Sequence, residues 1–138
     1  NKEPLATMDY QTIINAVQTN YMGTVNVALE AYPYLKQTQG KLVFFTSSSY
    51  TRGRAFYIIY SSTKAAIVNF VQAVAQEWDG DGIKINCINP ERTKTPMRQK
   101  NFGIEPDDTL LMPEKVAEAT LHTLASDSQG QVVDVRRK

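Results

Sequence analysis

The sequence predicts an α/β protein built on a parallel sheet. Three segments carry apolar residues at helical spacing, and a short apolar run rich in β-branched residues follows each of them. Helix and strand therefore alternate three times along the chain. This alternation is typical of a doubly wound parallel sheet with helices on both faces, here with three strands.

The first helix is predicted over residues 9–35. Asn20 and Gly23 interrupt its apolar stripe, so we expect the helix to bend there. The run KLVFFT follows at residues 41–46. Its almost continuous apolar, β-branched and aromatic content predicts a strand that is buried on both faces.

The remaining segments repeat this alternation, with turn signals between them. Gly80 and Gly82 should end the second helix, and Pro90 should stop the second strand because proline has no backbone N–H to donate. Pro113 suits the first turn of the third helix. In chain order the predicted segments are a polar loop (48–56), a helix (57–78), a strand (83–88), a polar loop (to 108), a helix (114–126) and a strand (131–135).

Composition limits the class of protein. The 138 residues suggest one modest domain, and a formal net charge of +1 gives no reason to expect nucleic acid or an anionic membrane as a partner. The single cysteine excludes an internal disulfide, and the N-terminus has no signal-peptide core. No uninterrupted apolar run reaches the length of a membrane span, so we expect a cytoplasmic protein.

A sheet of three strands would leave a hydrophobic edge open, which is an aggregation hazard for an isolated domain. The chain also begins without methionine, in what reads as a loop. We therefore expect that further strands precede residue 1 in a longer polypeptide.

The stretch SSSYTRGRAFYIIYSSTK, residues 47–64, holds the side chains best suited to chemistry. Tyr60 and Lys64 stand four residues apart and share a face of the predicted helix, where the ammonium would favour the phenolate. Such a tyrosine could exchange a proton with a carbonyl or alcohol oxygen. Ser47 ends the first strand, where active sites of parallel sheets lie, and could hydrogen-bond a substrate oxygen. Alone, a Tyr-x-x-x-Lys pair is a weak signal because it recurs by chance.

In combination, these residues resemble the C-terminal half of the short-chain dehydrogenase/reductase family. The resemblance rests on the Ser47 to Tyr60 spacing, on YSSTK, on QTNYMGTVNV and on INCINPERTKTPM. It implies a Rossmann-like sheet and a nicotinamide cofactor, NADPH or NADH. It also implies that Tyr60 is the acid/base and that Ser47 orients the substrate carbonyl. Lys64 would hold the nicotinamide ribose, and Asn20 would support a water-linked proton relay to it.

The same resemblance assigns the loop after the second strand to the cofactor. Pro90, Thr93 and Thr95 would meet the nicotinamide carboxamide, beside Tyr60 and Lys64.

The chain departs from the family pattern in two ways. Glu91 stands where the family usually has glycine, and the glycine-rich turn that holds the pyrophosphate is absent. We therefore expect residues 1–138 to be the catalytic half of such a domain, with the cofactor half before residue 1. We also expect no appreciable cofactor binding by this chain alone.

A longer run is similar to the reductase half of bifunctional ribitol-5-phosphate cytidylyltransferases. The matching segments are FFTSSSYTRGRAFYIIYSSTKAA, NPERTKTPMR and KNFGIEP. This similarity implies that ribulose 5-phosphate is reduced to ribitol 5-phosphate with NADPH. It also implies a preceding cytidylyltransferase domain that makes CDP-ribitol for capsule or cell-wall polymers.

Basic side chains gather in the two loops that should overhang the strand ends. Arg52, Arg54 and Arg92 are our candidates for contact with a substrate phosphate, because the planar guanidinium donates to phosphate bidentately. The second loop also carries Lys94, Arg98 and Lys100.

Two alternatives remain open from the sequence. The chain could belong to a general carbonyl reductase, whose uncharged substrate would leave the basic loops unexplained, or to a non-catalytic domain that supports dimerisation or a neighbouring transferase. The resemblance also implies a homodimer through the two long helices, whose apolar stripes are wide for a sheet of three strands. His122 is expected on a helix surface and Cys87 in the core, and no Cys/His cluster has metal-ligand spacing.

Overall fold

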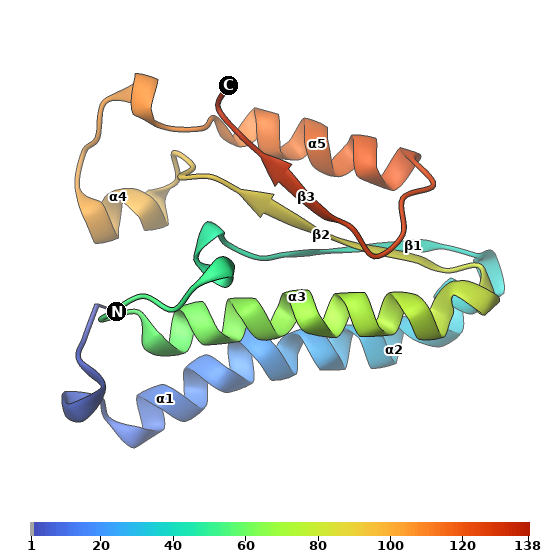
Figure 1. Ribbon diagram of the computed structural model, residues 1–138, viewed down its shortest axis with the longest axis horizontal. Helices are drawn as coiled ribbons and strands as arrows, with labels where there is room; N and C mark the ends of the chain where they lie inside the picture. Colours follow the sequence, from blue (N-terminus) through green and yellow to red (C-terminus); the bar gives the residue numbers. More distant parts are fainter. Residues whose placement is uncertain (1) are drawn as a thin grey trace.

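The computed structural model describes residues 2–138 and holds a parallel sheet with strand order β1–β2–β3. The strands are β1 (Lys41–Phe45), β2 (Lys84–Pro90) and β3 (Val132–Val135). β2 is central, because it pairs with β1 along its first five residues and with β3 along its last four. The carboxyl ends of the strands therefore meet at one edge of the sheet (Figure 1).

Helices cover both faces of this sheet, as the sequence predicts (Figure 1). One face is covered by α3, with α1 and α2 on its far side, and the other is covered by α5. A short helix, α4, lies beyond the carboxyl edge. The helices are α1 (Tyr10–Val17), α2 (Gly23–Thr38), α3 (Ile58–Trp78), α4 (Pro96–Phe102) and α5 (Pro113–Ala125).

The core is centred on β2, whose side chains alternate between the two faces. Ile85 and Cys87 pack with the apolar face of α3, whereas Ile88 packs on the other side of the sheet with Leu111. All four side chains are almost completely buried. The prediction that Cys87 is a small core residue is therefore confirmed.

The predicted helix over 9–35 consists of α1 and α2, which a π-helical turn, Gln18–Met22, joins. Asn20 lies in this turn and Gly23 directly follows it, so the irregularity falls where the apolar stripe is interrupted. The wider π turn rotates the faces of α2 about the helix axis relative to those of α1.

Three details differ from the sequence-based expectation. β1 is only half-buried, with Phe45 44% exposed, because β1 is an edge strand of the described sheet. β2 extends through Pro90, although the sequence predicts a strand that ends at residue 88 before this proline. A proline at a strand end removes only one ladder hydrogen bond, so the strand can include it. The polar loop expected to 108 contains α4, which begins at Pro96 after a Thr95 cap.

By length and composition alone, one segment could cross a membrane: Ile58–Asp81, with a mean hydropathy of 1.2. This differs from the expectation based on uninterrupted apolar runs, because the average includes the polar residues of α3. A core helix of a folded protein passes the same test, and α3 packs directly on β2.

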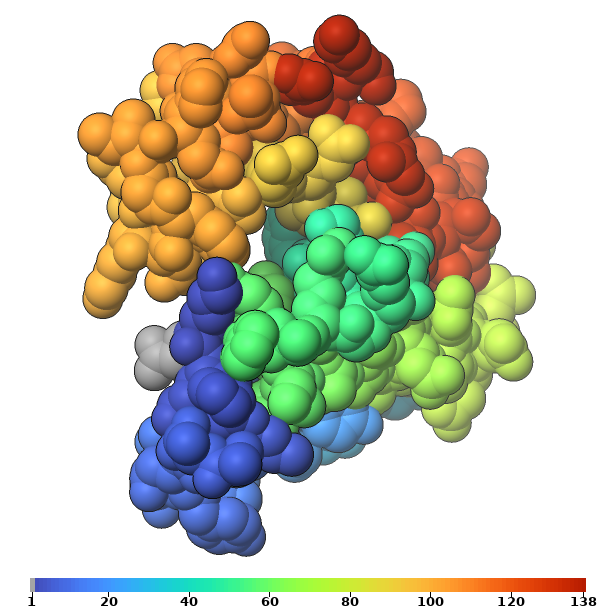
Figure 2. Space-filling model, turned by 60° about the vertical axis from the view of Figure 1, so that its left-hand side comes forward, coloured from blue at the N-terminus to red at the C-terminus, as the bar shows by residue number. Residues whose placement is uncertain are grey.

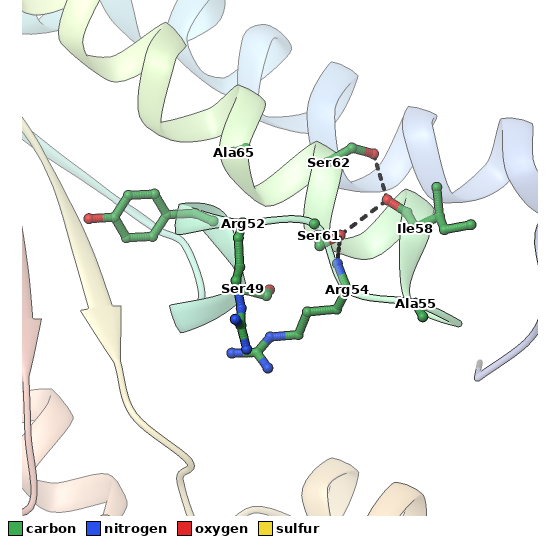
Figure 3. A pocket seen from close by; sticks show the side chains of 10 residues that line it. Ser49, Arg52, Arg54, Ala55, Ile58, Ser61, Ser62 and Ala65 are labelled. Atoms are coloured by element: carbon green, nitrogen blue, oxygen red, sulfur yellow. Dashed lines mark hydrogen bonds between the residues drawn. The ribbon is translucent and has the colours of Figure 1, made fainter.

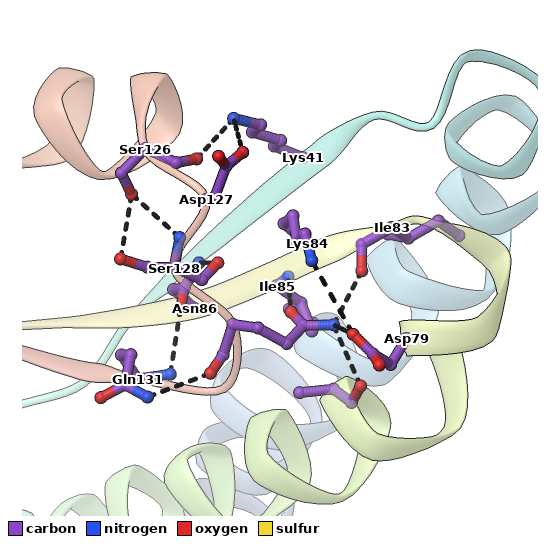
Figure 4. Close-up of polar contacts among 12 residues, drawn as sticks. Lys41, Asp79, Ile83, Lys84, Ile85, Asn86, Ser126, Asp127, Ser128 and Gln131 are labelled. Carbon is purple, nitrogen blue, oxygen red and sulfur yellow. Dashed lines mark hydrogen bonds and ion pairs between the residues drawn. The ribbon is translucent and has the colours of Figure 1, made fainter.

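The segment between α5 and β3 closes the amino end of the sheet through side-chain hydrogen bonds around β2 (Figure 4). Gln129 Nε2 donates to the carbonyl oxygens of Ala75 (3.0 Å) and Ile83 (2.8 Å). Its Oε1 accepts from the backbone N–H of Ile85 at 2.8 Å. One side chain therefore satisfies three backbone groups where α3 ends and β2 begins, and such groups are costly to leave unpaired.

We predict that Gln129→Ala lowers the free energy of unfolding by about 1–3 kcal/mol, because buried backbone groups lose their partners. Urea titration of the protein would measure the change. Gln131→Ala is the matched control, since within residues 2–138 the Gln131 side chain bonds a single, exposed group, the carbonyl oxygen of Gln129. Equal stability of the two variants would contradict the role assigned to Gln129.

Candidate active site

Ser47 leaves the carboxyl end of β1 and caps the 3₁₀ turn Ser48–Thr51. Its Oγ accepts hydrogen bonds from the hydroxyl of Ser49 at 3.1 Å and from the backbone N–H of Ser49 at 3.4 Å. These bonds fix the Ser47 hydroxyl and leave its proton for another acceptor. The position agrees with the sequence-based expectation of a site at the strand ends.

Tyr60 and Lys64 lie in the first turns of α3 and share a face, as their spacing predicts. The Lys64 Nζ atom is 5.7 Å from the centre of the Tyr60 ring. Tyr60 is 39% exposed, so the residue lies at the surface and not in the core. A tyrosine hydroxyl with a cation on its face is suited to proton transfer.

Lys64 is held by the end of β1. Its Nζ donates to the carbonyl oxygen of Phe45 at 3.3 Å, and burial lowers the pKa of its ammonium. Thr46 fastens the helix to the same strand end, since its hydroxyl donates to the Lys64 carbonyl oxygen at 2.8 Å while its N–H donates to Ile88 at 2.9 Å. Strand β1, strand β2 and helix α3 are thereby tied together next to Lys64.

Asn20 reaches the same helix from the π turn. Its Nδ2 donates to the hydroxyl of Thr63 at 3.3 Å, and Thr63 directly precedes Lys64. The structure therefore brings Asn20 to α3 through Thr63, and no direct bond to Lys64 is present in the described residues.

The loop after β2 places Pro90, Thr93 and Thr95 in sequence along the carboxyl edge. The Thr93 hydroxyl donates to the Glu91 carbonyl oxygen at 2.8 Å, and Thr95 Oγ1 caps α4 by accepting from the N–H of Arg98 at 3.1 Å. Both hydroxyls thus have local roles in shaping the loop. The backbone of Thr93, together with Thr95, remains the expected contact for the nicotinamide carboxamide.

The Glu91 side chain turns away from this loop and toward the chain end. Its carboxylate accepts from the backbone N–H of Arg137 at 3.0 Å and forms a 3.5 Å ion pair with Arg136. Its own N–H donates to Val135 at 3.0 Å. Glu91 therefore ties the loop to the end of β3.

Arg52 and Arg54 line a hollow of about 410 Å³ beside the start of α3 (Figure 3). Ser49, Ser61 and Ser62 add hydroxyls to its wall, and the Arg54 N–H donates to Ser61 Oγ at 3.4 Å. Within residues 2–138 neither guanidinium has a carboxylate partner. Ser47, Tyr60 and Lys64 are not part of the wall of this hollow.

The basic residues of the second loop divide into two kinds. Lys94 pairs with Asp107 at 2.9 Å, and Arg98 forms a bidentate pair with Glu105 at 2.8 and 3.0 Å. These two cations therefore stabilise the loop itself. Arg92 has no ion pair in the described part of the chain, although its charge helps the Arg98 bond to lower the pKa of Glu105.

One polar residue near the site was not singled out from the sequence. Asn89 is almost fully buried; its Nδ2 donates to Asp134 at 2.8 Å, while its Oδ1 faces no partner among residues 2–138. It lines a smaller hollow of about 220 Å³ with Glu91, Asp134 and Arg136. The only signal in the sequence is its place before Pro90 at a strand end.

Comparison with known proteins agrees with this architecture. The family model described as short chain dehydrogenase matches residues 1–105. The bifunctional ribulose 5-phosphate reductase/CDP-ribitol pyrophosphorylase Bcs1 of Haemophilus influenzae is 58% identical over 135 residues, which cover 98% of this chain and 28% of that protein. The uncharacterized oxidoreductase YciK of Escherichia coli K12 is 31% identical over 91% of this chain and 50% of its own length.

Solved structures share the fold. A short chain dehydrogenase from Escherichia coli CFT073, complexed with NADPH, superposes with a TM-score of 0.88 at 29% identity, covering 98% of this chain and 57% of that one. The chain spans 28% and 50% of the lengths of these two curated relatives and 57% of that structure. With Ser47, Tyr60 and Lys64 placed at the carboxyl edge of a parallel sheet, the chain belongs to the short-chain dehydrogenase/reductase family of oxidoreductases.

Proposed function

We propose that this chain is the catalytic half of a reductase domain that converts ribulose 5-phosphate to ribitol 5-phosphate with NADPH, and so supplies CDP-ribitol synthesis for capsule or cell-wall polymers. The observation that carries the proposal is the 58% identity to Bcs1 along 98% of this chain. Since the chain spans 28% of that relative, the cofactor-binding half and a cytidylyltransferase domain would belong to the rest of the protein.

The residues present fit a nicotinamide cofactor. The Lys64 ammonium has three donors and only one described partner, the Phe45 carbonyl oxygen, so two donors remain for ribose hydroxyls. When bound, NADPH would supply the hydride that reduces the carbonyl carbon.

Each side chain then has a defined task in the reduction. Ser47 would hydrogen-bond the carbonyl oxygen and orient it, while Tyr60 would donate the proton that completes the alcohol. The phenolate left on Tyr60 would be stabilised by the Lys64 ammonium on the same helix face. Asn20 would hold the Thr63–Lys64 segment in place and serve the return of a proton from solvent.

Arg52, Arg54 and Arg92 are proposed to meet the substrate phosphate. Their support is that none has a carboxylate partner within residues 2–138, in contrast to Lys94 and Arg98. A guanidinium without a partner can give its donors to an anion at little cost in lost contacts.

We further propose a cytoplasmic homodimer that associates through α2 and α3. Its support is that α2 exposes large apolar side chains, including Val27, Leu29 and Tyr34.

For the reductase chemistry, we predict that Tyr60→Phe abolishes turnover while NADPH binding remains. The measurement is NADPH oxidation by the full-length protein with ribulose 5-phosphate, compared with unphosphorylated ribulose. A general carbonyl reductase would reduce both sugars or neither, whereas a non-catalytic domain would be indifferent to Tyr60→Phe. Turnover that survives the substitution would contradict the role of Tyr60.

For phosphate recognition, we predict that alanine at Arg52, Arg54 and Arg92 together raises the KM for ribulose 5-phosphate by roughly tenfold or more, the size of one lost charge-assisted hydrogen bond. Lys115→Ala on α5 is the control for loss of a surface cation. An unchanged KM in the triple variant would remove these arginines from the substrate site.

For Lys64, the lowered pKa sets a direction for pH dependence. Since burial favours the neutral amine, Lys64 should lose its proton below the ordinary value of 10.5, and NADPH affinity should fall as the pH rises through that lowered pKa. In Lys64→Arg the charge persists, so the loss should move to higher pH. The dissociation constant of NADPH, measured against pH in the full-length protein, checks this; the same alkaline loss in both proteins would contradict it.

A further inference from the structure

A chain of stacked side chains joins α4 to the segment in front of α3. The rings of Tyr57 and Phe102 stack with centres 6.2 Å apart and planes inclined by 16°. Tyr57 precedes Tyr60 by three residues, and Phe102 is the last residue of α4. Figure 2 shows α4 (orange) and the start of α3 (green) on opposite sides of a hollow in the surface. The ring pair is a direct contact between these two walls.

Arg98 extends this contact through the body of α4. Its guanidinium carbon is 3.9 Å from the centre of the Phe102 ring, which is a cation–π distance. The same guanidinium makes the bidentate pair with Glu105, and both side chains are only 20% exposed. Glu105 therefore fixes Arg98, Arg98 fixes the Phe102 ring, and Phe102 stacks on Tyr57.

The backbone next to Tyr57 is held in an unusual conformation. Phe56 has a φ of 66°, in the left-handed region that a non-glycine residue rarely adopts. Its carbonyl oxygen accepts from the N–H of Glu3 at 2.9 Å, and the N–H of Tyr57 donates to Arg54 at 3.1 Å. Strained backbone persists where its surroundings hold it, so these hydrogen bonds hold the backbone segment that carries Tyr57.

We propose that Tyr57, Phe102, Arg98 and Glu105 form an aromatic clasp that positions α4, and the loop before it, over the catalytic residues. The proposal rests on the proposed function for its effect on substrate. These four are positioning residues, since none is expected to touch the reacting atoms. Because Thr95 caps α4 and Thr93 lies two residues earlier, a displaced α4 would displace the loop that carries Arg92, the proposed contact of the substrate phosphate.

The test uses three variants of the full-length protein, two at Phe102 and one control elsewhere on α4. Phe102→Leu keeps an apolar side chain but removes the flat ring that Tyr57 and Arg98 contact. Phe102→Tyr keeps the ring and should retain the contacts with Tyr57 and Arg98. Met97→Ala is the control, because Met97 is an exposed residue of α4 outside the clasp.

Two measurements separate the clasp from the proposed function. Hydrogen exchange over residues 96–105, measured without substrate, reports on the clasp alone. The KM and kcat for ribulose 5-phosphate report on its consequence, and the wild-type rate alone reports on whether the proposed substrate is right.

We expect Phe102→Leu to speed exchange of residues 96–105 and to raise KM about two- to tenfold, the worth of one aromatic pair, with kcat within about twofold. Phe102→Tyr and Met97→Ala should match the wild type. Unchanged exchange in Phe102→Leu would overturn the clasp itself. Faster exchange with an unchanged KM would overturn its positioning role, as would an equal loss in Phe102→Tyr.

Discussion

The structure depends on the burial of β2. The side chains of Ile85, Cys87 and Ile88 have no access to water, Asn86 is only 2% exposed, and Ile83, before the strand begins, is fully buried. Backbone groups that water does not reach must find all their hydrogen-bond partners within the protein. The groups of β2 pair with β1 on one side, with β3 on the other and with the Gln129 side chain at the amino end. These pairings are parallel, and they bring the carboxyl ends of the strands to one edge. The Ser47 hydroxyl, the Lys64 ammonium and the loop after Pro90 lie at this edge because each follows or contacts the carboxyl end of one of these strands.

Charge is used in two ways around this edge. The pairs Lys94–Asp107 and Arg98–Glu105 are internal to the α4 segment and stabilise the loop, the second bidentately and partly shielded from water. Arg52, Arg54 and Arg92 have no such partners in the part of the chain that the structure describes. A count of cations in the sequence treats all of these residues alike. The contacts separate those whose donors are already used from those still able to bind an anion, and this distinction makes the phosphate proposal specific.

The sequence was sufficient for features that depend on local patterns. Apolar spacing placed the helices and strands, and the interrupted stripe at Asn20 and Gly23 coincides with the π turn. Contacts between distant segments could not be found in this way. Nothing in the spacing of Tyr57 and Phe102 indicates that their rings stack. The sequence around Asn89 likewise gives no sign that its amide oxygen would be buried without a partner among residues 2–138. The half-exposure of β1 was missed for a related reason. The apolar composition of a strand shows that its side chains can be buried, but it does not show whether another strand or helix lies beside them.

Glu91 stands where the family usually has glycine, and its contacts explain how its side chain is accommodated. A free carboxylate beside a cofactor loop would repel phosphate and add a long side chain where the family usually has glycine. Here the side chain leaves the loop, accepts from the backbone N–H of Arg137 and pairs with Arg136. Its negative charge is therefore directed to a basic chain end, and the loop keeps the path set by the Thr93 and Leu111 bridge. Glu91 and the residues after β3 thus join the loop to the last strand of the sheet: without Glu91, Arg136 would keep its ion pair with Asp134, whereas the backbone N–H of Arg137 would lose its described partner.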